Sequence, residues 1–211
     1  MARTARSKRT VKARHDRDDH DDRDAEAILD TALEIAEERG WARTGLADVA
    51  RDLGLSLADV RAHYRDKDAL ANAWFERALA AMLAPGPGAF SALPVEERIA
   101  ESLRIWFSVL ATHRRVTRAM LSAKLYPGHP HHWGPLIFDL SRLVHWLLDA
   151  AGLNSPPPRR QLEEVALTGL VVAALSIWLN DRSPDRRLTD AFIRRALKRG
   201  GRFLGRLPLP R

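Results

Sequence analysis

The chain contains no cysteine, and several other features that would identify a class of protein are scarce or missing. Its 211 residues include no cysteine and only two tyrosines; the lack of cysteine excludes disulfides, thiolate catalysis and thiol-based redox sensing. The longest apolar run, residues 165–179, is interrupted by Thr168, Gly169 and Ser176 and is shorter than the roughly 20 apolar residues that cross a bilayer. The N-terminus also lacks the apolar segment of a signal peptide. We therefore expect a soluble cytoplasmic protein that does not associate with membranes.

Motifs for catalysis and metal binding are missing as well. The sequence has no nucleophile elbow, no phosphate-binding loop and no carboxylate pair with a clear role. His129, His131 and His132 lie in a proline-rich loop, but their spacing differs from that of helical zinc ligands, and no cysteine or nearby acid completes the set. We expect neither enzyme activity nor a bound metal or cofactor.

Charge is unevenly distributed along the chain. The 34 lysines and arginines exceed the 27 acidic residues by seven. Residues 1–15 carry six basic side chains and no acid, whereas residues 16–24 carry six aspartates and two arginines. We interpret residues 1–23 as a disordered arm, basic and then acidic. Its basic part could bind phosphates, or it could be a solubilising tail.

Hydrophobic spacing predicts helices almost throughout and no strands. We expect long helices over residues 24–39, 67–83, 94–111, 114–125, 136–151, 159–180 and 186–204, with two short helices between 44 and 64. The PGPG segment at 85–88 ends one of them. We therefore place one domain at 24–84 and a second at 85–211.

The two short helices form the most informative part of the sequence. Leu46, Val49 and Ala50 fall on one face of the first short helix, and Gly54 ends it. Ser56 is placed to cap the second short helix, with Asp59 as its capping-box partner. Asp66 can cap a further helix that begins at Lys67. This pattern predicts a helix-turn-helix, whose second helix lies in the DNA major groove.

The segment from Ile28 to about Leu83 resembles the N-terminal domain of TetR-family transcriptional regulators. The matching residues are Ile28, Leu29, Ala32, Leu33, Gly40, Trp41, Thr44, Val49, Ala50, Gly54, Leu55, Ser56, His63, Tyr64, Lys67 and Leu70. The resemblance implies an all-α fold of about nine helices: an N-terminal helix-turn-helix three-helix domain and a larger C-terminal helical domain for ligand binding and dimerisation. It also implies a ligand-responsive repressor that binds a palindromic double-stranded DNA operator as a homodimer.

Four of the expected DNA contacts lie at positions that match the family. Lys67 stands at a helix N-terminus, where the backbone N–H groups already favour an anion, so we expect it to bind a phosphate. His63 matches a position that commonly touches the DNA backbone. The Thr44 hydroxyl either caps the first short helix or binds a phosphate. Tyr64 packs in the small core, with a phosphate contact by its hydroxyl as a second role.

Three further expected contacts depart from the family pattern. Arg61 stands where the family usually has tyrosine, and it can bind either a phosphate or guanine O6 and N7. Asp59 can accept a hydrogen bond from cytosine N4 or cap its own helix, and we favour capping. Leu57 is unusual at an outward position, and it either touches a thymine methyl group or packs against the first long helix.

The helix predicted at 159–180 is apolar around its circumference. Such a helix must be covered on all sides. In TetR-like proteins the last two helices pair with their copies in a second subunit, so the resemblance implies a homodimer through residues 159–204. The alternative is a central helix buried within one monomer.

The C-terminal domain is expected to hold a small apolar or aromatic effector. Trp106, Met120, Tyr126 and Trp146 are the residues that we expect to line its pocket, because they are large and can line an irregular cavity. Aromatic residues and methionine at helical spacing are also common in an ordinary core.

A second functional class remains open. Some TetR-like folds bind lipid and assist ubiquinone biosynthesis without binding DNA. The segment 177–197 has a similar aromatic-x-x-Asp-x-Ser-x-Asp spacing ahead of a threonine. The basic arm and the His63 and Lys67 positions favour DNA binding over this alternative.

Overall fold

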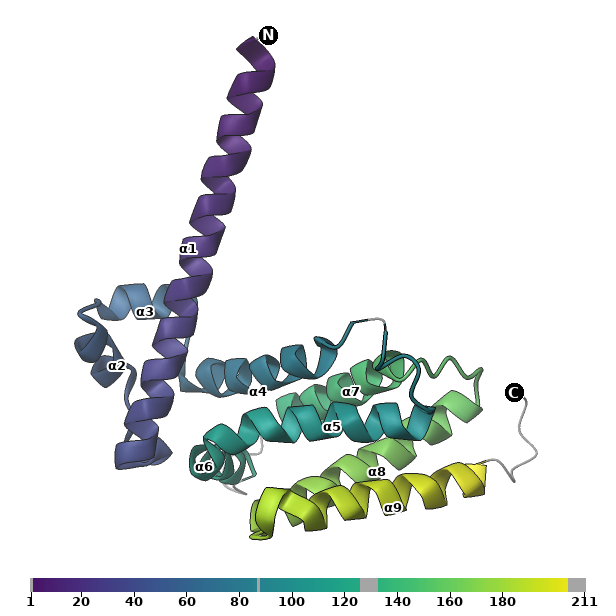
Figure 1. The fold of residues 1–211 in the computed structure, drawn as a ribbon. Helices are drawn as coiled ribbons and strands as arrows, with labels where there is room; N and C mark the ends of the chain where they lie inside the picture. The colour runs from purple at the N-terminus through teal and green to yellow at the C-terminus, as the bar shows by residue number, and fades with distance from the viewer. Residues whose placement is uncertain (1, 87, 126–132, 205–211) are drawn as a thin grey trace. The chain divides into compact units, whose positions relative to one another are not determined.

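The computed structural model describes residues 2–86, 88–125 and 133–204, with side chains described for 20–86, 88–125 and 139–202. Within these ranges the chain is all helical and contains no strand, as predicted. The α-helices are α1 (Ala2–Arg39), α2 (Leu46–Leu53), α3 (Leu57–His63), α4 (Lys67–Leu83), α5 (Val95–Thr112), α6 (Arg114–Lys124), α7 (Trp133–Ala150), α8 (Arg159–Asn180) and α9 (Arg187–Leu204). Two 3₁₀-helices, η1 (Trp41–Arg43) and η3 (Pro184–Arg186), complete the described helices (Figure 1).

Helix α1 differs from the expected arm. It begins at Ala2 rather than near Asp24, so residues 2–23 continue the helix instead of forming a disordered segment. No glycine or proline interrupts residues 2–39, and His20 and Asp24, four residues apart on the helix, lie 3.5 Å from each other. The sequence contains no signal that would end the helix before Gly40.

The chain divides into two compact units, Met1–Trp74 and Phe75–Arg211. The sequence predicted the boundary at 84/85, after α4, whereas it falls inside this helix. Leu70, Ala71 and Trp74, on the first half of α4, are buried. The first half of α4 therefore belongs to the N-terminal unit, a division that a turn signal in the sequence cannot reveal.

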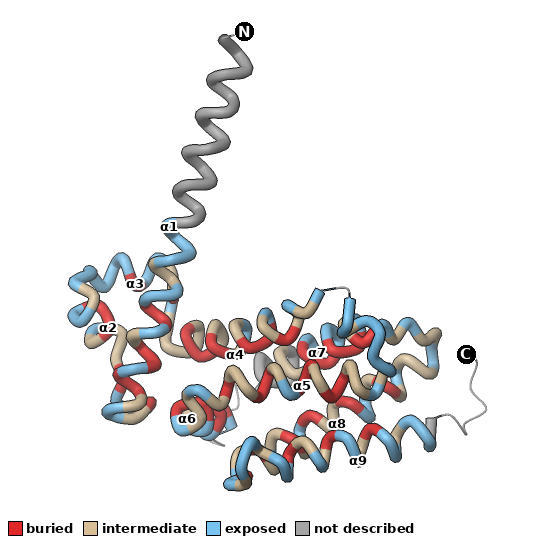
Figure 2. The backbone as a smooth tube through the Cα atoms, viewed as in Figure 1, coloured by how far each residue is buried: buried red, intermediate tan, exposed pale blue. Residues whose placement is uncertain are grey.

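The N-terminal unit has a small apolar core. Helix α1 contributes Ile28, Leu29 and Leu33, all nearly inaccessible to solvent. Val49 on α2 and Val60 on α3 pack into the same unit, where α1 contacts both helices. Burying a side chain of this size contributes about 1.5–3 kcal/mol. The core therefore holds α2 and α3 against α1, and it leaves the rest of α3 exposed (Figure 2).

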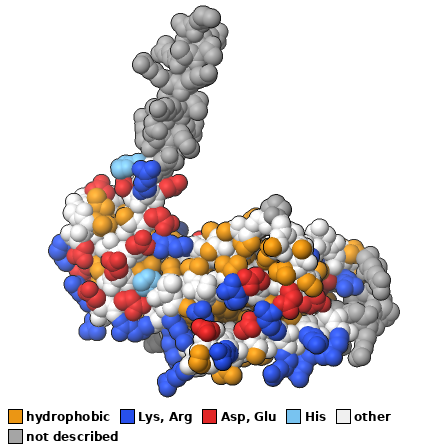
Figure 3. All heavy atoms as spheres, in the orientation of Figure 1, with side chains coloured by type: hydrophobic (Ala, Val, Ile, Leu, Met, Phe, Trp, Pro, Cys, Tyr) orange, Lys and Arg blue, Asp and Glu red, His pale blue; other side chains and the backbone are white. Residues whose placement is uncertain are grey.

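The second unit is a helical bundle. Helix α9 packs on α5 and α8, and α7 packs on α5 and α8 (Figure 1). The Phe107 and Trp178 rings stack with their centroids 5.4 Å apart, and Trp106 meets Phe107 edge-on at 5.0 Å. Acidic and basic side chains are interspersed over the visible face of α5 and α9 (Figure 3), where Arg194 pairs with Glu97 and Arg104 with Glu101.

One buried carboxylate organises the turn from α8 to α9. Asp181 is 3% exposed. Its Oδ1 accepts hydrogen bonds from the Ser183 N–H (2.9 Å) and hydroxyl (2.6 Å), and its Oδ2 accepts from the Thr189 N–H (2.8 Å) and hydroxyl (2.7 Å). Burial alone would raise the pKa of Asp181, but these hydrogen bonds outweigh it and hold the pKa well below its usual range.

Helix α8 has a large exposed apolar surface. It is long and apolar enough to cross a membrane by length and composition, and only 28% of its most apolar window is buried. Glu163, Leu167, Val171, Ala174 and Trp178 face the core. Val165 is 70% exposed and Val172 47% exposed. The expectation of an apolar helix is therefore confirmed, but this helix is not buried within one protomer.

Candidate DNA-binding surface

The turn between α2 and α3 depends on a left-handed residue. Gly54 ends α2 with φ 67° and ψ 23°, a conformation that costs other residues about 1–2 kcal/mol. The N–H groups of Gly54 and Leu55 donate to the carbonyls of Arg51 (3.2 Å) and Ala50 (2.8 Å). These bonds satisfy the end of α2 and allow α3 to begin three residues later.

A complete capping box begins α3, as the sequence predicted. The Asp59 N–H donates to the Ser56 hydroxyl oxygen (3.2 Å), and the Ser56 N–H and hydroxyl donate to Asp59 Oδ2 at 2.9 and 2.7 Å. The hydrogen bond from the Ser56 side chain, followed by that from its backbone, lowers the pKa of Asp59. Asp59 is therefore an ionised cap in this structure, which favours capping over the cytosine contact.

Helix α3 has one buried side and one exposed side. Val60 is inaccessible and Tyr64, just after the helix, is 8% exposed; the Tyr64 hydroxyl donates to the Ala25 carbonyl at 3.0 Å. Arg61 is exposed, and Leu57 is 56% exposed. Leu57 therefore does not fill the core. The outward side of α3 presents the Arg61 cation and one large apolar side chain, that of Leu57. His63 is half-buried at the end of the helix.

Lys67 is at the N-terminus of α4, but it has contacts within the protein that the sequence did not reveal. Its ammonium donates to the carbonyls of Trp41 and, at 3.4 Å, Ala42, and it lies 4.7 Å from the centroid of the Trp41 ring. Burial lowers the pKa of Lys67, although the neighbouring Asp68 opposes this shift. Asp66 accepts from the Ala69 N–H at 2.8 Å, as predicted.

Thr44 does not cap α2. Gly45 is the N-cap residue, and its N–H donates to Asp48 Oδ2 at 3.3 Å. Thr44 is 4% exposed, and its hydroxyl donates to the Gly40 carbonyl at 3.2 Å. The hydroxyl is thus already engaged after the turn at Gly40, so the capping alternative for Thr44 is wrong.

Two exposed cations near these residues were not selected from the sequence. Arg43 is exposed at the end of η1, where its Nε donates to the Arg39 carbonyl at 2.8 Å. Arg65 follows Tyr64 and pairs with Asp66 at 3.1 Å, with both side chains largely solvated. Their positions next to Thr44 and Lys67 were the only indication in the sequence that they lie near the DNA-binding residues. Arginines are so common in this chain that this indication did not distinguish them.

Comparison with known proteins agrees with this geometry. Residues 28–74 match bacterial regulatory proteins of the tetR family. The crystal structure of the TetR transcriptional regulator from Nitrosomonas europaea ATCC 19718 is 35% identical, with a TM-score of 0.74, and the match covers 84% of this chain and 97% of that one. The chain belongs to the TetR family. It is therefore a DNA-binding transcriptional regulator and not an enzyme.

More distant structures share the fold of this TetR-family regulator. A TetR transcriptional regulator from Rhodococcus sp. RHA1 is 21% identical with a TM-score of 0.58, and the match covers 82% of this chain and 91% of that one. A TetR-like regulator from the same organism is 19% identical with a TM-score of 0.53, covering 85% of this chain and 96% of that one. No curated protein matches the chain at a significant level.

The predicted effector residues of this TetR-family regulator are not brought together around a described cavity. Trp106 is 5% exposed and Met120 is inaccessible, so both are packed in the core. Trp146 is 46% exposed. Tyr126 lies outside the described residues, as do the three histidines of its loop.

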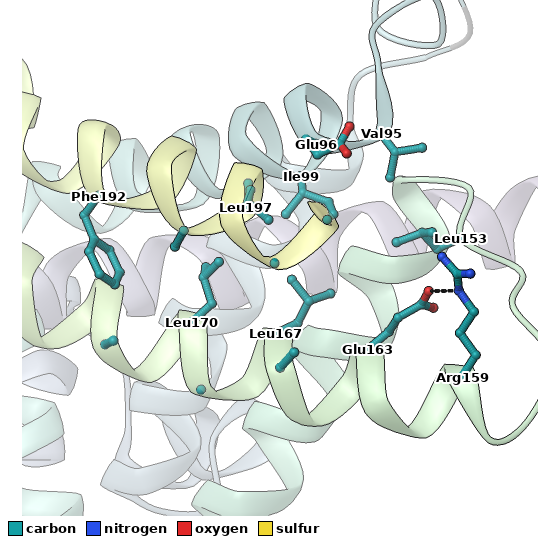
Figure 4. A pocket seen from close by; sticks show the side chains of 16 residues that line it. Val95, Glu96, Ile99, Leu153, Arg159, Glu163, Leu167, Leu170, Phe192 and Leu197 are labelled. Atoms are coloured by element: carbon teal, nitrogen blue, oxygen red, sulfur yellow. Dashed lines mark hydrogen bonds and ion pairs between the residues drawn. The ribbon is translucent and has the colours of Figure 1, made fainter. Parts of the chain in front are cut away.

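A described pocket of the second unit lies elsewhere. It has a volume of about 560 Å³ and lies between α5, α8 and α9 (Figure 4). Ile99, Leu153, Leu167, Leu170, Phe192 and Leu197 supply most of its apolar lining. The sequence offered one signal for it, the small residues Gly169, Ala173, Ala196 and Gly200 on two successive helices. Such a stripe is equally typical of close helix packing, so it did not identify a pocket.

Proposed function

We propose that this TetR-family regulator is a cytoplasmic, ligand-responsive repressor that binds a palindromic operator as a homodimer. The observation that carries the proposal is the exposed side of α3, held by the Gly54 turn and the Ser56–Asp59 box. A helix fixed at both its start and its buried face can enter the major groove without reorganisation. A dimer bound to an operator at a promoter would block access to that promoter, and for this reason we propose a repressor.

The proposed base contacts come from Arg61 and Leu57. Arg61 is exposed and carries a planar pair of N–H donors that fits guanine O6 and N7, a contact that discriminates by about 1–3 kcal/mol. Leu57 is the exposed apolar side chain of the same helix, so a thymine methyl group is its proposed partner.

The proposed phosphate contacts surround α3. Lys67 has three ammonium protons, and two of them are directed to the Trp41 and Ala42 carbonyls. We propose that the third reaches a phosphate while the other two fix the side chain. His63 and the hydroxyls of Thr44 and Tyr64 are the remaining proposed contacts. Because a phosphate only accepts hydrogen bonds, each hydroxyl would have to turn its single hydrogen from the carbonyl that it now binds, of Gly40 or Ala25, toward the DNA.

The proposed dimer forms through residues 159–204. Val165 and Val172 on α8 and Leu188 on α9, which is 62% exposed, would leave apolar side chains in water in a single protomer. Covering apolar surface contributes about 25 cal/mol per Å². A second copy offers the same surface, and a two-fold arrangement suits recognition helices about 34 Å apart on one face of DNA.

The proposed effector is small and apolar or aromatic, with Trp106, Met120, Tyr126 and Trp146 as the proposed contacts. Because Trp106 and Met120 are packed in the core, binding to them would require the surrounding helices to move apart. Helix α4 offers a route for coupling, because its residues belong partly to the N-terminal unit and partly to the second unit. A ligand that shifts this helix would change the separation of the two recognition helices in the dimer. Coupling of this kind is typically about 1–3 kcal/mol.

The lipid-binding alternative loses its sequence support. The motif that suggested it includes Asp181, Ser183 and Thr189, and these residues form the hydrogen-bonded turn before α9. Their spacing therefore has a structural cause that requires no lipid.

An operator-selection experiment tests the proposed function. Random duplexes are selected on the full-length protein, and affinity for the enriched sequence is measured by fluorescence anisotropy. We expect a two-fold symmetric consensus and a loss of about 1–3 kcal/mol for Arg61→Ala. Arg118→Ala, which removes an exposed cation from α6 outside the proposed dimer interface, is the control and should change affinity by much less. No enriched sequence, or equal effects of the two substitutions, would contradict the proposal.

A further inference from the structure

The pocket between α5, α8 and α9 contains a buried acceptor with an unused oxygen. Glu163 is 4% exposed and lies on the first turns of α8, at one end of the pocket (Figure 4). Its Oε1 accepts from the Ser155 hydroxyl at 2.9 Å and from Arg159 Nε at 3.0 Å. Its Oε2 is buried and has no hydrogen-bond partner among the described residues. Leaving a buried carboxylate oxygen without a donor is costly, so a ligand that brings a hydrogen-bond donor to Oε2 would be favoured at this position.

The charges at this end of the pocket favour a cation. Glu163 and Glu96 line the pocket together with a single guanidinium, that of Arg159. Two carboxylates against one guanidinium leave a net negative charge, which repels an anionic head group and attracts an ammonium. A primary ammonium also brings three donors, enough to satisfy Glu163 Oε2 and still bind a second oxygen.

The remaining walls fit an apolar body. Leu167 and Leu170 on α8 and Phe192 and Leu197 on α9 continue from the carboxylate end along the groove between these two helices (Figure 4). A volume of about 560 Å³ falls within the range of roughly 300–1,000 Å³ for small-molecule sites. Gly169 and Gly200 line the groove, and a Cβ added at either would meet no atom within 4 Å, so the space beside them is open.

A third glycine, Gly201, leaves room for one of the two carboxylates. A Cβ at Gly201 would lie 2.9 Å from Glu96 Oε1, so the absence of a side chain there allows the Glu96 carboxylate to lie against α9. The two carboxylates thus reach the pocket from different helices, α5 and α8.

We propose that this pocket binds an amphipathic primary amine, with its ammonium on Glu163 Oε2 and its apolar chain along the groove between α8 and α9. This site is separate from the residues proposed for the apolar effector. It does not depend on the proposed repressor function, because it rests only on residues of the second unit.

Calorimetric titration of the full-length protein tests the site with three probes of equal chain length: octylamine, octanol and octanoate, each below its micelle concentration. We expect octylammonium to bind saturably, one per protomer, at least tenfold tighter than octanol, and octanoate to bind more weakly than either. Glu163→Gln should weaken octylammonium at least tenfold and leave octanol unchanged, because the amide turns its N–H₂ toward the ligand.

The adjacent glutamate provides a matched control. Glu164 pairs with Arg160 at 2.9 Å with the same four-residue spacing as Glu163 with Arg159, but it is not part of the pocket lining. Glu164→Gln should therefore leave octylammonium affinity unchanged. Gly200→Leu should block binding by filling the groove, whereas Gly200→Ala should preserve it. Both substitutions also favour the helix, so loss of folding does not explain the difference.

Three results would overturn the proposal. The first is equal binding of octylammonium to wild type and Glu163→Gln, and the second is the absence of saturable binding, in which case water satisfies Oε2. The third is a combined result: wild type binds no amine, and Gly200→Leu dissociates the protein into monomers. This result would assign the groove to a second copy of the chain.

Discussion

Removing the Asp181 carboxylate should destabilise the second unit more than any surface substitution near it. Asp181→Ala eliminates four hydrogen bonds at once, two from Ser183 and two from Thr189. These bonds fix the turn between α8 and α9, the two helices proposed to form the dimer. The substitution therefore tests how much this turn contributes to the free energy of unfolding of the second unit.

The expected magnitude follows from burial and geometry. Loss of a helix cap costs about 0.5–2 kcal/mol, and a buried N–H without an acceptor costs about 1–3 kcal/mol. The Thr189 N–H would be such a donor, since Thr189 is 3% exposed. Together these terms give a loss of about 2–4 kcal/mol, which for a chain of this size lowers the Tm by about 5–15 °C.

Thermal unfolding followed by circular dichroism measures this change. Asp190→Ala is the matched control, because Asp190 lies on α9, directly after Thr189, and pairs with Arg194 at 2.9 Å with both side chains about 40% exposed. A solvated pair of this kind contributes about 0–1 kcal/mol. If the two substitutions lower the Tm equally, the Asp181 network does not stabilise the turn as described.

The effect should also depend on pH. The pKa of Asp181 is lower in the folded chain than in the unfolded one, so the folded state binds fewer protons and its stability rises with pH. The contribution is complete above the unfolded pKa of about 3.9 and is lost as pH falls toward the folded value. The Tm difference between wild type and Asp181→Ala should therefore be full at pH 7 and smaller at pH 3; a difference that does not shrink would contradict this reasoning.

Three further substitutions test other elements. Gly54→Ala forces a side chain into φ 67° and should cost about 1–2 kcal/mol, measured by urea unfolding; no loss would mean that the turn can relax. Ser56→Ala removes the cap of α3 and should cost about 1 kcal/mol, whereas Ser56→Thr should retain most of it; equal stabilities would argue against the capping box. Val172→Glu places a charge on the exposed face of α8 and should convert the proposed dimer into monomers in light scattering, while a dimer that survives would place its interface elsewhere.

Local signals in the sequence predicted much of the fold. Helices α4 and α8 begin and end where the sequence placed them, because Asp66 and the surrounding prolines and glycines act within a few residues. The same holds for the turn at Gly54 and the box of Ser56 and Asp59. These features depend on the chain immediately around them, so a single sequence contains the information.

Features that depend on distant residues were not predictable in the same way. Lys67 meets the Trp41 carbonyl across 26 positions of sequence, and no local pattern indicates such a contact. The boundary inside α4 depends on tertiary contacts on either side of Trp74, and the pocket depends on how α5, α8 and α9 pack together. The exposure of Trp146, expected to line a cavity, likewise depends on the packing of α7.

The salt dependence of DNA binding tests the central claim that α3 reads a duplex. Affinity for the selected operator and for an unrelated duplex is measured for wild type and Arg61→Ala at salt concentrations from about 50 to about 300 mM, a roughly sixfold range. We predict steep salt dependence on both duplexes, tighter binding of wild type to the operator, and loss of this preference in Arg61→Ala with little change in slope. Binding that ignores salt, or an operator preference that survives Arg61→Ala unchanged, would contradict the claim.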